Sequence, residues 1–236
     1  MQSATPGIKG ISSMATRQLL AELVSGFEKQ SGYGAAIEAV GGVDAAKRVV
    51  AGETFDVVVL ASDAIDKLLA AGHLQAGSKV DLVKSGVAAC VRTGTPLPDF
   101  GSEDAVKRAV LAARSISYST GPSGVALGRL FERWGIAEEI AGRMVQAPPG
   151  VPVGTLVARG DVELGFQQLS ELLHVKGITV VGPLPPAIQI TTVFSAGIHA
   201  GVPAGSAQFE RLKAMLDYMR SPQALEAKQR QGMDPA

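Results

Sequence analysis

The chain has 236 residues, of which 46% are hydrophobic and 19% charged, and its 22 basic and 22 acidic residues give a formal net charge of zero. A chain this apolar and this balanced in charge is not of the disordered class. It has no basic excess to neutralise a phosphate backbone, which argues against nucleic-acid binding. The length fits one or two domains with a sizeable core.

Strand and helix patterns alternate from the start of the chain. Ile8–Ile11 is expected to form a strand, and Ser12-Ser13 to cap a helix that runs to about Gln30. The elements expected next are the strand Ala36–Val40, the helix Val43–Ala51, the strand Phe55–Leu60 and the helix Ala64–Ala71, capped by Ser62-Asp63. This order predicts an α/β fold with a parallel sheet between two layers of helices.

The strand Val87–Arg92 is followed by a turn-rich stretch at residues 93–98 and then by a second alternating series. The expected strands of this series are Ser115–Tyr118 and Glu163–Phe166, and its expected helices are Glu103–Ala113, Ser123–Trp134, Ala137–Arg143 and Val153–Arg159. After it come the expected strand Ile188–Ala196 and two helices, Ala207–Met219 and Pro222–Gln231, which are expected to pack back on the first lobe. Strands near residues 90 and 190 join the two series, which predicts two lobes with two crossings. Lobe 1 is expected to contain residues 1–88 and 193–236, and lobe 2 residues 89–192, with a ligand cleft between the lobes.

Several of the expected strands end in Ser or Gly and lead directly into a helix. The backbone N–H groups and partial positive charge of a helix start, with nearby hydroxyls, hold anions without Lys or Arg. The residues at such positions are Ser12, Ser13, Gly41, Gly42, Ser62, Ser119, Thr120 and Ser123. Any one of them is more commonly only a helix cap, so the anion hypothesis depends on the whole set. The densest stretch, Ser117–Gly124, lacks the Gly-Lys-Ser/Thr of a P-loop and does not indicate nucleotide hydrolysis.

The residue types that most often carry catalysis or metals form no constellation. The single cysteine, Cys90, lies in an apolar run and is expected to be buried. The histidines share no ligand spacing, so neither a metal nor a cofactor is predicted. Glu171 is interpreted as an exposed helix charge, and Arg17 as either a partner for a carboxylate or a solvated side chain.

No apolar run approaches the roughly 20 residues needed to span a bilayer. The start of the chain has neither the basic residues nor the apolar stretch of a signal peptide. We therefore expect either a periplasmic protein in its mature form, with the signal peptide removed, or a cytoplasmic protein.

Four segments together, by their order and spacing, are similar to one family. They are Ile11–Met14 with the helix end Phe27–Gly32, the segment Ala51–Asp63, the loop Tyr118–Gly124 and the stretch Val157–Phe166. The chain resembles, over nearly its whole length, the substrate-binding proteins of molybdate-type ABC transporters. The resemblance implies the two-lobed type 2 periplasmic-binding-protein fold, with the ligand in a cleft between the lobes.

The resemblance also implies positions for ligand contacts. Ser13 stands where the family has its first ligand-binding serine, and Ser123 where a backbone N–H contacts the anion. Gly150 or Val151 stands near another backbone donor. Ser13 and Ser123 are two of the three preferred contacts.

Two positions depart from the family pattern. Gly41-Gly42 replaces the family's second serine, and Gln167 or Gln168 replaces its tyrosine. The loss of two hydroxyls loosens the ring of donors that a tetrahedral oxyanion needs, and favours a carboxylate or a larger organic anion. Gln168 is the third preferred contact.

The function expected first is that of a monomeric solute-binding protein, which captures a small oxyanion or organic carboxylate for an ABC permease. The alternative is an isomerase of an unsaturated polycarboxylate, because aconitate isomerase, which interconverts cis- and trans-aconitate, has the same fold. That reaction needs a base near the substrate carbon, and the sequence places no acid or histidine there. A cytosolic sensor without a transporter is a third hypothesis.

Overall fold

The computed structural model describes residues 7–148 and 150–236. The described chain forms two compact units, one with the residues up to Lys84 together with Val193–Ala236, the other with Ser85–Thr192. Both boundaries lie inside strands, β4 (Val80–Arg92) and β8 (Thr191–Ile198). The sequence places its boundaries after residues 88 and 192. That the units act as lobes with a ligand cleft stays a prediction.

The sheet of the first unit is built around parallel strands. β1 (Ile8–Ser13) pairs in parallel with β2 (Ala35–Val40) on one side and β3 (Val57–Ala61) on the other. β3 pairs antiparallel with β8, the order continues to β4, and β9 (Met233–Pro235) also pairs with β4. Every residue of β3 is buried, as its β-branched sequence predicts. The carboxyl ends of β1, β2 and β3 therefore lie at the same edge of the sheet.

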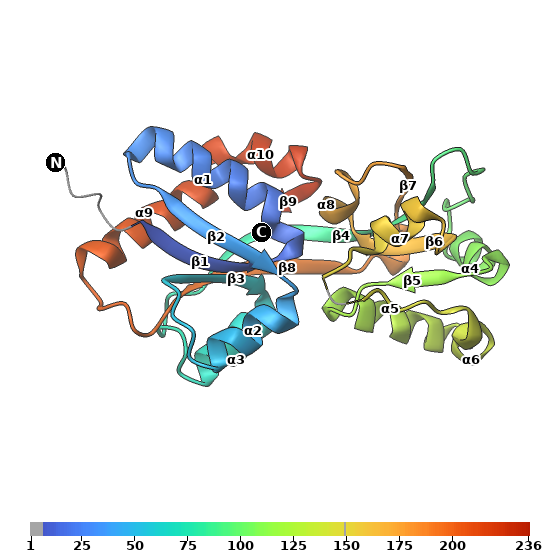
Figure 1. Cartoon of the computed structure of the whole chain (residues 1–236), viewed down its shortest axis with the longest axis horizontal. Coiled ribbons are helices and arrows are strands. Elements are labelled where there is room, and N and C mark those ends of the chain that lie inside the picture. Colours follow the sequence, from blue (N-terminus) through green and yellow to red (C-terminus); the bar gives the residue numbers. More distant parts are fainter. Residues whose placement is uncertain (1–6, 149) are drawn as a thin grey trace. The chain divides into compact units, whose positions relative to one another are not determined.

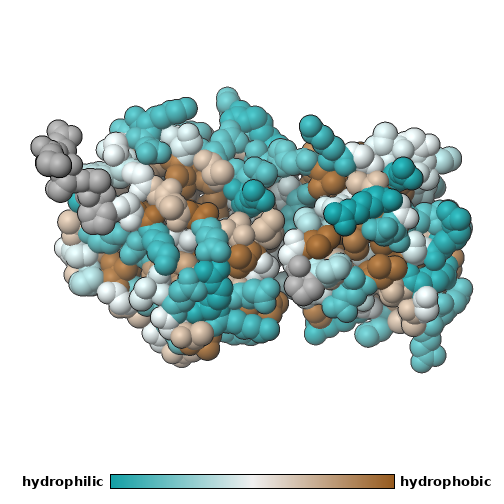
Figure 2. All heavy atoms as spheres, in the orientation of Figure 1, coloured by the Kyte–Doolittle hydropathy of each residue, from teal (hydrophilic) through white to brown (hydrophobic). Residues whose placement is uncertain are grey.

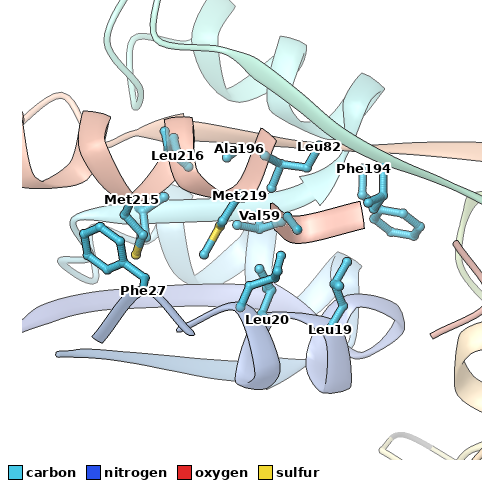
Figure 3. Packing of buried hydrophobic residues seen from close by; sticks show 14 of the residues in the cluster. Leu19, Leu20, Phe27, Val59, Leu82, Phe194, Ala196, Met215, Leu216 and Met219 are labelled. Carbon is cyan, nitrogen blue, oxygen red and sulfur yellow. The ribbon is translucent and has the colours of Figure 1, made fainter. Parts of the chain in front are cut away.

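Helices cover both faces of this sheet (Figure 1). On one face lie η1 (Met14–Thr16), α1 (Arg17–Ser31), α9 (Ala207–Arg220), η4 (Pro222–Ala224) and α10 (Leu225–Arg230), and on the other α2 (Gly42–Val50) and α3 (Ser62–Ala70). Leu20 and Phe27 of α1 pack with Met215 and Met219 of α9 (Figure 3). A fully buried side chain of this size contributes about 1.5–3 kcal/mol. Gly32, with φ of 76°, ends α1 in the left-handed conformation that glycine adopts readily.

The second unit has its own mixed sheet. Its elements are the second half of β4, α4 (Glu103–Ala112), β5 (Ile116–Tyr118), α5 (Pro122–Arg133), α6 (Ala137–Ile140), η2 (Ala141–Arg143), α7 (Val153–Arg159), β6 (Leu164–Gln168), α8 (Leu169–Leu172), β7 (Ile178–Pro183) and η3 (Pro186–Ile188). β5 runs parallel to β6, and β4 runs antiparallel to both β6 and β7. Phe166 of β6 packs in the cluster that contains α5 residues, whereas a Cβ at Gly165 would meet Val153 and Val157 of α7. Alternate residues of β6 thus face opposite helical layers.

The structure confirms the predicted alternation of strands and helices, with corrections at particular elements. β4 begins at Val80, earlier than expected, and β7 and β9 were not anticipated. The strand expected at Ile188–Ala196 begins only at Thr191, because Pro186–Ile188 forms a 3-10 turn. β7 contains Gly182 and ends at Pro183, residues that the sequence pattern assigns to a turn.

Figure 2 shows hydrophilic residues over much of the visible face, with hydrophobic residues in small, separate areas. In the part of the chain that the structure describes, every helix is too short or too polar to cross a membrane.

Candidate functional site

The carboxyl ends of three parallel strands bring together one set of predicted ligand residues. Ser13 ends β1, Gly41 and Gly42 follow β2, and Ser62 follows β3. A Cβ added at Gly42 would lie 3.5 Å from the Cβ of Ser13, so these two positions are in contact range. We call Ser13, Gly41, Gly42 and Ser62 the first-unit donor set.

The two adjacent serines of β1 have different roles. The Oγ of Ser13 accepts a hydrogen bond from the N–H of Ala15 at 3.2 Å and caps η1, as predicted. Its own hydroxyl proton remains available to a ligand. Ser12 is completely buried and donates its hydroxyl to the carbonyl oxygen of Glu38 at 3.4 Å. Ser12 therefore ties β1 to β2, and its proposed role as a ligand donor is not supported by this geometry.

α2 and α3 both begin without a side-chain cap. Their N-cap residues are Gly41 and Ala61, so the expectation that Ser62-Asp63 caps the helix is wrong. Ser62 is instead the first, half-buried residue of α3. Asp44 and Asp63 lie in the first turns of these helices, where they stabilise the same partial positive charge that would attract an anion. The binding of an anion at these helix starts would therefore depend more on hydrogen bonds than on net charge.

A second set of predicted residues lies at the carboxyl ends of β5 and β6, which are parallel neighbours. The hydroxyl oxygens of Ser119 and Ser123 are 3.1 Å apart, and Ser123 is buried. α5 begins after Gly121 with no side-chain cap. Gly124 packs so closely on the carbonyl oxygen of Ser119 that any Cβ would overlap it. This close approach explains why position 124 is a glycine.

Gln168 ends β6 and adds an amide to this second set. Its Nε2 donates to Oγ1 of Thr192 at 2.8 Å. Its Oε1 is buried and has no hydrogen-bond partner among the described residues. A buried polar atom without a partner is costly, and a ligand that pairs with it removes that cost. Rotating the amide by half a turn would offer an N–H donor instead, with Thr192 donating to the oxygen. We call Ser119, Ser123 and Gln168 the second-unit donor set.

Gln167 and Glu171 form a separate contact beside this set. Nε2 of Gln167 donates to Oε1 of Glu171 at 2.8 Å, and Oε1 of Gln167 accepts from the N–H of Gly154 at 3.3 Å. Burial raises the pKa of Glu171 to about 7, against the opposing effect of the Gln167 hydrogen bond. The interpretation of Glu171 as an exposed helix charge is therefore wrong. The sequence carries no signal for this burial, because glutamate side chains are usually exposed and strand β6 ends before Glu171.

The remaining predicted donors do not join these sets. Thr120 and Gly150 are exposed, and Gly150 has φ of 76°. The N–H of Val151 donates to the carbonyl oxygen of Pro148 at 3.0 Å, so it is already used in a turn. Pro149, part of the expected loop, lies outside the described residues, as do residues 1–6.

The other residues of interest have structural surroundings. Cys90 is completely buried, as expected, and burial raises the pKa of its thiol to about 12. Nδ1 of His199 accepts a hydrogen bond from the N–H of Gly201 at 3.1 Å. Within residues 7–148 and 150–236, no three His, Cys, Asp or Glu side chains gather as metal ligands would.

Comparison with known proteins places the chain in a family. Residues 8–234 match a family model described as bacterial extracellular solute-binding protein. An aconitate isomerase from a Pseudomonas species is 36% identical over 231 residues, which cover 95% of this chain and 86% of the relative. The periplasmic molybdate-binding protein of Azotobacter vinelandii has a TM-score of 0.78 at 20% identity, over 97% of this chain and 99% of its own. The tungstate ABC transporter structure from Geobacter sulfurreducens has a TM-score of 0.74 at 17% identity, over 95% and 98% of the two chains. These matches confirm the expected fold class, and the chain belongs to the family of bacterial extracellular solute-binding proteins.

Proposed function

We propose that this protein binds an unsaturated organic polycarboxylate and interconverts its isomers, with cis- and trans-aconitate as the substrates. Gln168 is the observation that carries the proposal. With its amide rotated by half a turn, so that Thr192 donates to the oxygen, this buried side chain offers an N–H donor to a carboxylate, which only accepts hydrogen bonds. The similarity to an aconitate isomerase over 95% of the chain supports this substrate class.

The donor sets suit carboxylates better than a tetrahedral inorganic oxyanion. The second-unit donor set supplies two hydroxyls and one amide, and the first-unit donor set has glycines where the resemblance implies a serine. Arg17, the exposed first residue of α1, follows Ser13 closely in the chain and supplies a positive charge for one carboxylate.

The test is to add each isomer of aconitate to the purified protein and follow the composition by proton NMR. Citrate, molybdate, tungstate and sulfate are compared by thermal shift. We expect both isomers to reach the same equilibrium mixture, and aconitate to raise the melting temperature. Stabilisation by molybdate or tungstate alone, without isomerisation, would refute the organic substrate.

Ser123→Ala tests the second-unit donor set, with Ser102→Ala as its matched control. Ser123 lies in the first turn of α5, and Ser102 immediately precedes α4. Ser102 only caps its helix, because its Oγ accepts a hydrogen bond from the N–H of Ala105 at 3.2 Å. We expect Ser123→Ala to weaken aconitate binding and Ser102→Ala to leave binding unchanged. Equal affinities in both variants would remove Ser123 from the site. Ser13→Ala tests the first-unit donor set in the same assay.

A second candidate is capture of an organic anion without turnover, for delivery to an ABC permease. The family model, described by extracellular solute binding, favours it. In that case the protein is a periplasmic monomer, and a carboxylate binds tightly while its isomeric composition stays constant. The NMR assay separates the two candidates, because only the isomerase changes the ratio of isomers.

A further inference from the structure

We propose that the pair Gln168 and Thr192 lets the same site bind a second class of ligand, the hydroxy polycarboxylates, and that Thr192 is the positioning residue that holds the Gln168 amide for each class. The inference rests on the proposed function, because it takes the second-unit donor set as part of the polycarboxylate site. A hydroxy polycarboxylate is what results when water adds across the double bond of an unsaturated one. It therefore offers the same carboxylates and, in addition, a hydroxyl that can donate a hydrogen bond.

The Gln168 amide, in the orientation that the structure shows, presents an acceptor rather than a donor. Gln168 is only 3% exposed. Its Nε2 donates to Oγ1 of Thr192 at 2.8 Å, and its Oε1 has no hydrogen-bond partner among the described residues. A carboxylate cannot pair with this oxygen, because both groups only accept hydrogen bonds. A ligand hydroxyl can donate to it, and this removes the cost of a buried polar atom without a partner.

Thr192 can support either orientation of the amide. A threonine hydroxyl has one donor and two acceptor lone pairs, and its proton rotates to suit its partner. Gln168 is the only hydrogen-bond partner of this hydroxyl in the described part of the chain. Thr192 is β-branched and lies in strand β8, so its side chain rotates little and the oxygen stays in place while the proton turns. The amide can therefore turn by half a turn and keep its partner.

The amide lies on the same face of the second sheet as the two candidate hydroxyls. Gln168 comes two residues after Phe166 in β6, and residues two apart in a strand face the same side. Phe166 packs against Phe131 of α5, with the ring centroids 6.2 Å apart. Ser119 and Ser123 lie around the start of this same helix, and β5, which precedes them, is the parallel neighbour of β6. The amide and both hydroxyls thus lie at one end of one sheet face.

Each orientation of the amide completes a chain of hydrogen bonds with one class of ligand. With a hydroxy polycarboxylate, the ligand O–H donates to Oε1 of Gln168, and Nε2 donates to Thr192. With an unsaturated polycarboxylate, Nε2 donates to a ligand carboxylate, and the Thr192 hydroxyl donates to Oε1. Both ends of the amide have a partner in either complex, and hydrogen bonds in such a chain strengthen one another. The switch between the two classes requires only rotation of the amide.

Citrate and tricarballylate are a matched pair of probes, because they share three carboxylates and differ only in the hydroxyl. We expect the purified protein to bind citrate about two- to tenfold more tightly than tricarballylate in calorimetry, the range typical of one hydrogen bond. In Gln168→Leu the two affinities should become equal. Equal affinities in the wild-type protein, or a preference that persists in Gln168→Leu, would overturn the hydroxyl contact.

Thr192→Val tests the positioning role, with the neighbouring Thr191→Val as matched control. Valine keeps the branched shape and removes the hydroxyl, and Thr191 is exposed and makes no side-chain hydrogen bond to the described residues. We expect Thr192→Val to bind citrate and aconitate about two- to tenfold more weakly, because an amide that is not held must be ordered on binding. Thr192→Ser should restore both affinities. If Thr192→Val binds both ligands as Thr191→Val does, Thr192 has no positioning role.

Rotation of the amide has an NMR signature of its own. The side-chain N–H₂ protons of Gln168 should show nuclear Overhauser effects to Thr192 in the ligand-free protein and in the citrate complex. In the aconitate complex the effects should instead connect these protons to the ligand. The same pattern in both complexes would contradict the rotation. This measurement uses the wild-type protein, so it tests the inference even if a variant does not fold.

Three outcomes separate this inference from the proposed function. If the wild-type protein isomerises aconitate but has no preference for citrate over tricarballylate, only the inference fails. If it prefers citrate as expected but never isomerises aconitate, the proposed turnover fails and the second ligand class is supported. If it binds none of the three acids, both fail.

Discussion

Replacing Glu171 with Gln should make the folded protein more stable at alkaline pH and leave its stability unchanged at acidic pH. Burial raises the pKa of this carboxyl from 4.5 to about 7. The folded state therefore holds the proton more tightly than the unfolded state does. The contribution of Glu171 to stability is fully present below about pH 4.5 and is lost as the pH rises through about 7. The difference between 4.5 and about 7 corresponds to about 3.5 kcal/mol, at about 1.4 kcal/mol for each pKa unit, and is an upper bound.

Urea unfolding at about pH 5 and about pH 8.5 measures this difference, with Glu138→Gln, at an exposed acid on α6, as control. Gln at position 171 can still accept the hydrogen bond from Gln167 through its amide oxygen, so the substitution changes charge with little change in packing. We expect the free energy of unfolding of Glu171→Gln to exceed that of the wild type by up to about 3.5 kcal/mol at the higher pH and by less than about 1 kcal/mol at the lower pH. A difference that is the same at both pH values would mean that the Glu171 carboxyl ionises as a solvated one does. The argument that burial raises the pKa of Glu171 would then be wrong.

Three further predictions concern α5, the second-unit donor set and the thiol. Gly124→Ala should destabilise the fold by several kcal/mol in the urea unfolding assay, because the new Cβ would overlap a backbone oxygen. Gly128→Ala is the control: its Cβ would meet only the hydroxyl of Tyr118 at 3.5 Å, so this variant should be neutral or stabilising. Ser123→Ala should weaken aconitate binding by about tenfold in calorimetry, from loss of roughly 1.4 kcal/mol, with the melting temperature of the ligand-free protein nearly unchanged; a large fall would assign Ser123 to structure instead. Cys90 should react with a thiol reagent only as fast as the protein unfolds, because burial hides the thiol and raises its pKa to about 12.

The parts of the fold that the sequence predicts are those in which one segment carries its own signal. The β-branched run before Ser62 is buried on both faces, and its pattern indicates a central strand without knowledge of its neighbours. The leucines of α1 follow helical spacing for the same reason, since one face packs on the sheet. β7 is only partly buried along its length and ends in a proline, so its pattern is closer to that of a turn.

The candidate site is harder to predict because its contacts join residues that are distant in the chain. Gln168 is recognisable from the family resemblance, but its partner Thr192 lies on another strand, and only the folded structure pairs them. The prediction that Glu171 is exposed is wrong for a related reason. A glutamate is usually exposed, and nothing in its neighbours indicates that its carboxyl is enclosed. The serine at position 13 is predicted correctly because a cap is a local interaction.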